Sequence, residues 1–211
     1  GPRLEEIEPE VAAVAEYRDH PAGTNRISAS EHVANGVVSP RLADVLPRYP
    51  DLKVELTIDY GLADIVEQRY DIGIRLGERV AQDMIAVPVT GPQRMAIVGS
   101  PAYFRTHAAP QRPADLAAHD CIGLRLPTHG GLMVWALRKD EQNVNVRVQG
   151  QWTFNSSIAM HRAALAGGGL AYLLEDMVLE DIAAGRLQRV MQDWCDVFDG
   201  FYAYYPSRRQ S

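Results

Sequence analysis

Cysteine and long apolar runs are both scarce in this chain of 211 residues. Its two cysteines, Cys121 and Cys195, form neither a CxxC pair nor a Cys/His cluster with the spacing of a metal site. A reduced cytoplasmic setting suits them, and a single disulfide between them stays an alternative. No stretch approaches the roughly 20 apolar residues that a membrane span needs, and no basic segment followed by an apolar one marks an export signal. We therefore expect a cytoplasmic protein without a membrane partner.

Positive charge is in the minority as well. Lysine and arginine together number 21, against 27 for aspartate and glutamate, which gives a formal net charge of -6 at pH 7. Such a chain is poorly suited to bind the phosphate backbone of nucleic acid by itself. Any contact with DNA is expected to come from another domain.

Motifs of catalysis and metal binding are also missing. GxSxG, SxxK and a reactive cysteine beside a histidine do not occur in a convincing context, and the six histidines form no HExxH or HxxxH pair. The glycine run at 166–170 lacks the GK[ST] of a phosphate loop, so we expect it to end a helix and let it pass close to a strand. The sequence thus argues against an enzyme and calls for no metal and no cofactor.

Four apolar residues near the start of the chain fall at heptad spacing: Leu4, Ile7, Val11 and Val14. Pro9 would cost about 3 kcal/mol in a helix interior. We therefore expect the helix to begin at Pro9 as a first-turn residue and to end near Arg18. A frayed tail is the alternative.

The segments from Thr24 to Ser100 alternate between strand-like and helix-like patterns. Strands are expected over 26–30, 53–59, 71–77, 84–89 and 94–100, and helices over 33–46 and 61–68. Such alternation predicts an open, mostly parallel sheet whose ligand sites lie at the carboxyl ends of its strands.

The second half of the chain is built differently. Its expected strands cover 121–127, 132–138, 143–150, 168–174, 186–191 and 200–206, and its expected helices cover 158–167 and 175–185. Ser156 and Ser157 are suited to cap the first of these helices. The order of expected strands and helices changes near residues 94–100. This change predicts two α/β lobes linked by strands that cross between them.

A series of segments resembles, in this order along the chain, the effector-binding domain of LysR-type transcriptional regulators. The segments are "HPAGTNRISAS", "RYPDLKVEL", "DIVEQRYDIGIRLGE", "DMIAVPV", "RMAIVGSPAYF", "PADLAAHDCIGLRLPT", "ALAGGGLAYLLEDMV", "GRLQRV", "DWC" and "FYAYYPSRRQ". The combination is specific, although "DIGIR" alone is weak. The resemblance implies an α/β fold of the type II periplasmic-binding-protein-like class, with two Rossmann-like lobes joined by crossover strands.

The resemblance also implies partners and domain limits. In that family a winged helix-turn-helix DNA-binding domain comes first and a dimerising linker helix follows. Residues 1–22 are then the end of the linker helix, residues 23–95 and 203–211 form lobe I, and residues 96–202 form lobe II. We expect a homodimer or higher homo-oligomer that reaches DNA only through a domain absent from this chain.

Two features depart from the family pattern. Arg69 stands where the family usually has glycine before the third strand, so we expect a turn conformation that a non-glycine residue tolerates. The family also continues into a C-terminal helix that packs on the first lobe, whereas this chain stops at "PSRRQS".

The first lobe supplies candidate residues for an effector cleft that is expected between the lobes. Ser30, Glu31 and His32 follow the first strand, where backbone N–H groups at a helix start favour an anion. A simple N-cap for Ser30 and a plain surface position for His32 are the alternatives. Gly61 and Leu62 follow the second strand, and Leu62 replaces the family's small hydroxyl residue, which favours a partly apolar effector.

Arg75 is the one charge at the end of "DIGIR". Its guanidinium suits a bidentate contact with a carboxylate, which makes a carboxylate one candidate class of effector. A salt bridge from Arg75 to Asp71 or Glu78 is the alternative role.

The second lobe supplies Phe154, Asn155 and Ser156, in a segment that the resemblance places at the cleft. Phe154 is expected to cover a ligand, and the other two are expected to donate hydrogen bonds to it. A turn or helix-cap role for Asn155 is the alternative.

We therefore expect the ligand-sensing regulatory domain of a LysR-type DNA-binding transcriptional regulator, which binds a small-molecule effector and does no chemistry. The alternative is a solute-binding protein or an enzyme on the same periplasmic-binding-like fold.

Overall fold

The computed structural model describes residues 23–59, 65–77, 83–126 and 131–207. The chain divides into two compact units: unit 1 comprises residues 1–92 and 199–211, and unit 2 comprises residues 93–198. The lobe limits expected from the sequence, after residues 95 and 202, fall a few residues later than these divisions. The linker helix expected within residues 1–22 lies outside the described residues.

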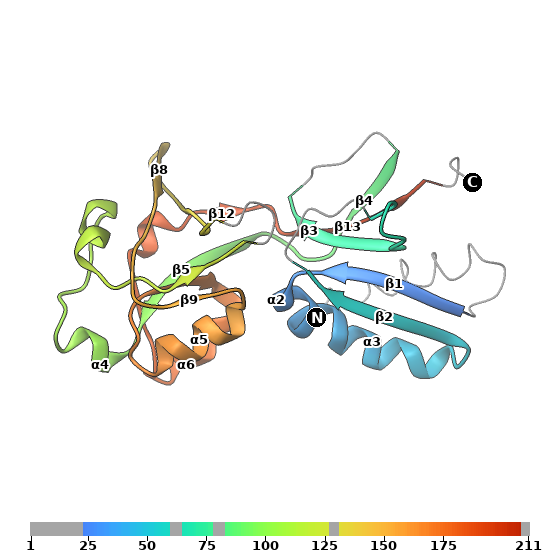
Figure 1. Cartoon of the computed structure of the whole chain (residues 1–211), viewed down its shortest axis with the longest axis horizontal. Coiled ribbons are helices and arrows are strands. Elements are labelled where there is room, and N and C mark those ends of the chain that lie inside the picture. Colours follow the sequence, from blue (N-terminus) through green and yellow to red (C-terminus); the bar gives the residue numbers. More distant parts are fainter. Residues whose placement is uncertain (1–22, 60–64, 78–82, 127–130, 208–211) are drawn as a thin grey trace. The chain divides into compact units, whose positions relative to one another are not determined.

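Unit 1 is built on a five-stranded sheet with the order β2-β1-β3-β13-β4 (Figure 1). β1 pairs in parallel with β2 and β3, while β13 runs antiparallel to β3 and β4. The expected mostly parallel sheet is therefore confirmed, with one antiparallel strand contributed by the end of the chain. The strands are β1 (Gly23–Ala29), β2 (Leu52–Ile58), β3 (Ile72–Leu76), β4 (Met84–Pro88) and β13 (Phe201–Pro206).

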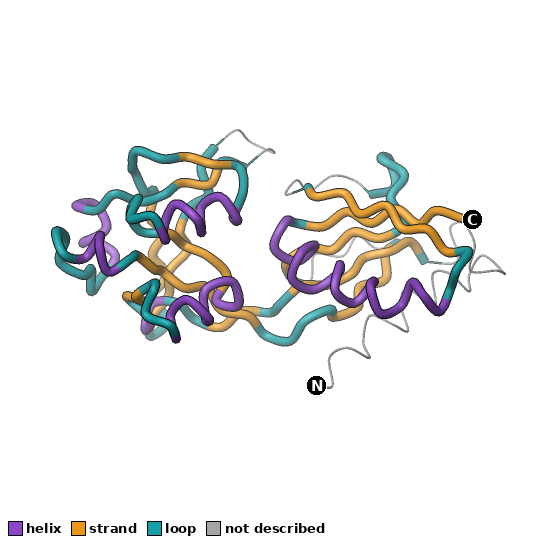
Figure 2. Tube along the Cα trace, turned by 90° about the horizontal axis from the view of Figure 1, so that it is seen from below, coloured by secondary structure: helices purple, strands orange, loops and turns teal. Residues whose placement is uncertain are grey.

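One continuous helical stretch runs along a face of this sheet (Figures 1 and 2). It comprises α2 (Glu31–Val33), a π-helical turn η1 (Ala34–Val38), α3 (Ser39–Val45) and a 3-10 turn η2 (Leu46–Arg48). The apolar side chains of the stretch and of the strands are buried, including Val33, Val38, Leu42 and Val45 and also Ile27, Ala29, Ile72 and Ile74. The helix expected over 33–46 is confirmed and begins slightly earlier, at Glu31.

The segment before β3 differs from the expectation in two ways. Residues 60–64 lie outside the described part, and Ile65–Arg69 form turns instead of the expected end of a helix. Arg69 has a φ of 62°, which is the left-handed region that favours glycine. The expectation of a conformation suited to other residues is therefore wrong, because the turn keeps the left-handed backbone although arginine occupies it.

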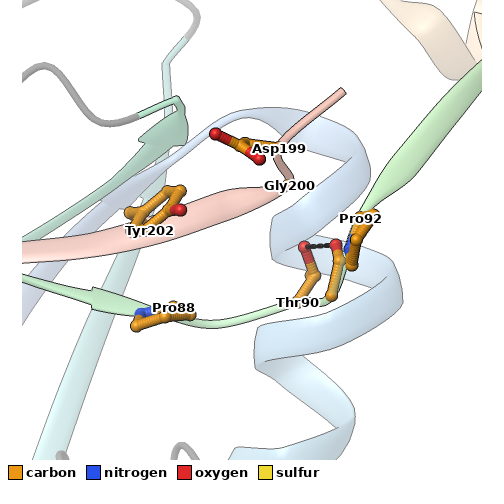
Figure 3. A pocket seen from close by; sticks show the side chains of 7 residues that line it. Pro88, Thr90, Pro92, Asp199, Gly200 and Tyr202 are labelled. Atoms are coloured by element: carbon orange, nitrogen blue, oxygen red, sulfur yellow. Dashed lines mark hydrogen bonds between the residues drawn. The ribbon is translucent and has the colours of Figure 1, made fainter. Parts of the chain in front are cut away.

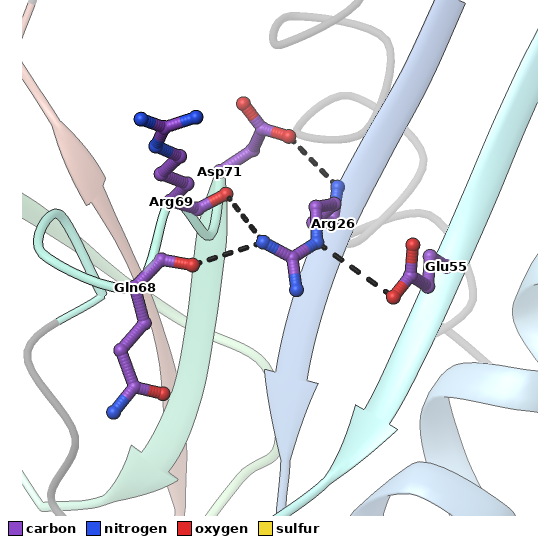
Figure 4. Close-up of polar contacts among 5 residues, drawn as sticks. All are labelled: Arg26, Glu55, Gln68, Arg69 and Asp71. Carbon is purple, nitrogen blue, oxygen red and sulfur yellow. Dashed lines mark hydrogen bonds and ion pairs between the residues drawn. The ribbon is translucent and has the colours of Figure 1, made fainter.

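Arg26 of β1 fastens this turn to the sheet (Figure 4). Its guanidinium donates to the carbonyl of Gln68 at 2.9 Å and to that of Arg69 at 3.4 Å. Its backbone N–H donates to Asp71 Oδ2 at 2.7 Å, and its Nε lies 3.7 Å from Glu55 Oε1. These contacts hold the backbone on both sides of the left-handed residue.

Unit 2 contains an antiparallel sheet with the order β10-β5-β11, and β12 also pairs with β5. The pairs β6–β9 and β7–β8 form two smaller sheets. Its strands are β5 (Gln93–Gly99), β6 (Gly123–Leu124), β7 (Trp135–Lys139), β8 (Gln142–Val146), β9 (Thr153–Phe154), β10 (Ala171–Leu174), β11 (Gln188–Val190) and β12 (Val197–Phe198). Its helices are α4 (Pro101–Phe104), α5 (Ser157–Leu165) and α6 (Glu175–Ala183), with 3-10 turns η3 (Pro113–Ala118) and η4 (Gln192–Trp194).

Two apolar cores of unit 2 lie on opposite sides of β5, because alternate residues of a strand face opposite ways. Ile97 belongs to one core, and Ala96 and Val98 belong to the other. The first core contains Cys121 and Cys195, which are both free and buried. The alternative of a disulfide between them is therefore wrong.

The glycine run after α5 plays the expected structural role. The φ of Gly169 is +130°, and a Cβ at this position would lie 2.1 Å from the carbonyl oxygen of Asp120. Leu170 can then bridge to Cys121 as the chain enters β10. No helix among the described residues is long and apolar enough to cross a membrane.

Candidate functional site

Polar side chains gather at the carboxyl ends of β1, β2 and β3. These strands run parallel, with Ala29 in register with both Ile58 and Ile74, so their ends meet at one edge of the sheet. Ser30 follows β1, Asp59 follows β2 and Arg75 lies in the last part of β3. Gly61 and Leu62, which were expected beside them, lie outside the described residues.

Ser30 occupies the N-cap position of α2, and its carbonyl accepts from the N–H of Ala34 at 2.9 Å. Its side chain makes no capping hydrogen bond, so the role of a side-chain cap is not realised. Ser30, Glu31 and His32 are all half-buried. The Ser30 hydroxyl therefore does not hydrogen-bond to the backbone at the start of α2.

Arg75 contacts the backbone of β1 and β3 and one serine hydroxyl, and the alternative of a salt bridge to Asp71 or Glu78 stays open. Its Nη1 donates to the carbonyls of Ser28 and Ile74 at 3.1 and 2.8 Å, and its Nη2 donates to the Ser28 hydroxyl at 2.9 Å. Asp71 accepts from the backbone N–H of Arg26, and Glu78 lies outside the described residues. Burial lowers the pKa of Arg75, while the charge of Asp59 and the nearby Tyr70 act in the opposite direction.

Asp59 is a member of this group that the sequence reasoning missed. Its backbone N–H donates to the carbonyl of Ala29 at 2.8 Å, which extends the pairing of β1 and β2 by one residue. Its carboxylate lies close enough to Arg75 to affect the pKa of the guanidinium. The available signal was its position directly after a strand of the parallel sheet.

The second candidate group lies in unit 2. Ser156 is the N-cap of α5, and its hydroxyl accepts from the N–H of Ala159 at 3.2 Å, which confirms the expected cap. Asn155, the alternative cap, is exposed. Phe154 packs against a core cluster and meets Trp152 edge to face at 5.1 Å between ring centroids. Trp152 is 48% exposed and was also missed by the sequence reasoning.

A pocket of about 280 Å³ opens within unit 1 (Figure 3). Thr90 is already engaged there, because its hydroxyl accepts from the N–H of Phe201 and donates to the carbonyl of Gly91. Tyr202 lies in register with Arg75 on one side and with Pro88 on the other. Sequence reasoning gave no sign of this pocket, since its walls come from segments distant in the chain: Pro88, Thr90, Gly91, Pro92, Asp199, Gly200 and Tyr202.

The thiols of unit 2 are poor nucleophiles. Burial raises the pKa of Cys121 to about 12 and that of Cys195 to about 11, so both stay protonated near neutral pH. Within the ranges that the structure describes, no group of three or more His, Cys, Asp or Glu residues is placed to hold a metal ion.

Comparison with known proteins defines the class. The LysR substrate binding domain family matches residues 18–211. The chain belongs to this family and is the effector-binding domain of a LysR-type transcriptional regulator. The resemblance read from the sequence and the two-lobed periplasmic-binding-protein-like fold are thereby confirmed, and the alternative of a solute-binding protein or enzyme is not favoured.

Individual relatives are transcription regulators. A putative transcriptional regulator of Pseudomonas aeruginosa is 48% identical over 210 residues, which cover 100% of this chain and 69% of that protein. The HTH-type transcriptional regulator PgrR of Escherichia coli is 38% identical over 211 residues, 100% of this chain and 71% of PgrR.

Solved structures agree. CrgA, a LysR-type regulator from Neisseria meningitidis, superposes with a TM-score of 0.77 at 26% identity, covering 98% of this chain and 69% of CrgA. The regulatory domain of AphB from Vibrio vulnificus gives a TM-score of 0.76 at 25% identity, over 88% of this chain and 91% of that domain.

Proposed function

We propose that this regulatory domain senses a small carboxylate-bearing metabolite at the carboxyl ends of β1, β2 and β3, with Ser30, Glu31, His32 and Arg75 around it. Gly61, Leu62, Phe154, Asn155 and Ser156 remain candidate effector residues on the sequence reasoning. The full-length regulator works as a homo-oligomer and contacts DNA through its separate domain. Binding does no chemistry. It shifts the populations of regulator conformations by no more than the effector's difference in affinity for them.

The observation that carries this proposal is the fixed guanidinium of Arg75. Two backbone carbonyls and the Ser28 hydroxyl hold it at the strand ends, so little side-chain freedom is lost when an anion binds. Asp59 lies near the same cation and is expected to turn toward solvent or to be displaced when a carboxylate arrives.

Screening carboxylate metabolites by thermal shift finds the effector, because a ligand at 100 times its dissociation constant adds about 2.7 kcal/mol of stability.

With an effector identified, Arg75→Ala should weaken binding by about 1.5 to 3 kcal/mol, the usual contribution of a charged hydrogen bond. Asn155→Ala should cost about 1 kcal/mol. Calorimetry measures both values.

Arg105→Ala is the control, since Arg105 is an exposed arginine of unit 2 and its loss removes the same charge. It should leave affinity unchanged. If Arg75→Ala binds the effector as the wild type does but melts at a lower temperature, Arg75 serves the fold and the proposed contact is wrong.

A further inference from the structure

Arg94 of β5 carries a positive charge that the described chain leaves unmatched. The residue is half-buried and pairs with Val197 of β12. Its Nε is buried and has no hydrogen-bond partner. Across the residues that the structure describes, its guanidinium also has no ion pair. A half-buried arginine without an acceptor calls for an explanation, because buried polar groups are nearly always hydrogen-bonded.

Arg189 of β11 brings a second guanidinium to the same part of unit 2. Its Nη2 donates at 3.3 Å to the carbonyl of Met95, the residue after Arg94, and its Nη1 lies 2.7 Å from Glu175 Oε2. Burial raises the pKa of the Cys195 thiol, while the charges of Arg189 and Arg94 both hold it down. Both guanidinium groups therefore lie within electrostatic reach of one sulfur atom.

The acidic side chains of this region are engaged elsewhere. Asp193 Oδ2 lies 2.7 Å from Lys139 Nζ, and Asp196 Oδ2 lies 3.8 Å from Arg138 Nε. Glu175 is the carboxylate that Arg189 uses. Among the described residues Glu175 therefore pairs with Arg189, and no carboxylate pairs with Arg94.

We propose that Arg94, with Arg189 beside it, forms an anion-binding site in unit 2 that takes the carboxylate or phosphate group of a small molecule. The planar guanidinium fork matches both groups and binds them through two parallel hydrogen bonds, which a lysine cannot do. The terminal nitrogens of Arg94 make the contacts with the anion, while its buried Nε fixes the start of the fork. This site shares no residue with the strand-end group of unit 1.

The test uses inorganic phosphate and acetate as separate probes, at constant ionic strength set with chloride. Thermal shift and phosphorus NMR line width measure binding to the folded protein. We expect saturable binding of at least one probe, which also identifies whether phosphate or carboxylate is preferred. Arg94→Gln should weaken that binding at least tenfold. Arg94→Lys should retain the charge but bind several-fold more weakly, because the fork is lost.

Arg105→Gln is the matched control, since it removes the same charge from an exposed arginine of the same unit. It should bind the probe as the wild type does. Without any probe, Arg94→Gln should melt no lower than the wild type, because the buried Nε has no partner to lose. A lower melting temperature would instead indicate a structural role for Arg94 and contradict the proposal.

Three further results would overturn the site. They are no saturable binding of either probe, equal binding by Arg94→Gln and the wild type, and an equal loss in Arg105→Gln, which would indicate general charge attraction. Probe binding that Arg75→Ala abolishes and Arg94→Gln leaves intact would place the anion in unit 1. That outcome would reject the Arg94 site while supporting the proposed effector contact.

Discussion

Some residues of this domain adopt backbone conformations that their residue type disfavours. Arg69 is the clearest case, because its φ of 62° places an arginine in the left-handed region. The Cβ of a non-glycine residue costs roughly 1–2 kcal/mol there. The contacts from Arg26 to the neighbouring carbonyls and to Asp71 offset that cost and keep the turn in place.

Arg69→Gly should therefore raise the free energy of unfolding by about 0.5 to 1 kcal/mol. Glycine relieves the backbone strain, and its greater freedom in the unfolded chain cancels part of that gain. Urea unfolding measures the change. Arg105→Gly serves as the control, since the φ of Arg105 is -64° and no strain is relieved there. Glycine at this position only increases the conformational entropy of the unfolded chain. That variant should lose stability. A loss in both variants would show that the left-handed turn stores no strain.

At the scale of elements, a buried carboxylate ties α5 to α6. Asp181 of α6 accepts from Nε2 of His161 in α5 at 2.6 Å and from Nε of Arg186 at 2.6 Å. Burial by itself would raise the pKa of Asp181, but the hydrogen bonds from Arg186 and His161 outweigh it and hold the pKa below the ordinary value. A depressed carboxyl pKa stabilises the fold above the unfolded pKa, and this contribution is lost as the pH falls through the folded pKa.

Asp181→Asn should consequently cost about 1.5 to 3 kcal/mol near neutral pH, where charged hydrogen bonds are lost. The difference from the wild type should begin to shrink below about pH 4, where the unfolded carboxyl takes up a proton, and should vanish only below the lower pKa of the folded state. Chemical unfolding across pH 3 to 7 tests this. If the difference in unfolding free energy between Asp181→Asn and the wild type stays constant with pH, the charge of Asp181 contributes nothing to the contact between α5 and α6.

Sequence periodicity predicted elements well where apolar spacing is regular, and poorly where contacts decide the conformation. The helix from Glu31 and the strands of unit 1 follow from apolar spacing, and the N-cap of α5 follows from serine chemistry. The turn at Arg69 does not, because residue type argues against its backbone and only the contacts of Arg26 explain it.

The candidate site shows the same division. Ser30 and Arg75 became candidates because strand ends are visible in the sequence. The hydrogen-bond partners of Arg75 and its nearness to Asp59 depend on side-chain geometry instead. Arg94 and Arg189 are separated by almost half of the chain, so no local pattern relates them.

At the scale of the whole molecule, we expect an isologous homodimer in which the first helix of one subunit meets α5 of the other, as the family resemblance implied. Val33, Val38 and Leu42 are buried within unit 1 and are not available for such a contact. The apolar residues available for it are only half-buried: Val37 and Leu46 on the first helix, and Ile158, Ala159 and Leu165 on α5.

Val37→Glu and Ile158→Glu should each raise the dimer dissociation constant at least about tenfold. A tenfold change corresponds to 1.4 kcal/mol, and burying an unpaired carboxylate costs more than that. Light scattering over a range of protein concentrations measures the constant. Ala136→Glu, at an exposed position of β7 outside both helices, should leave it unchanged. The two-fold axis places each substitution in the interface twice, so the dissociation constant should change even if the dimer contact is small. A wild-type chain that stays monomeric at high concentration would refute this assembly.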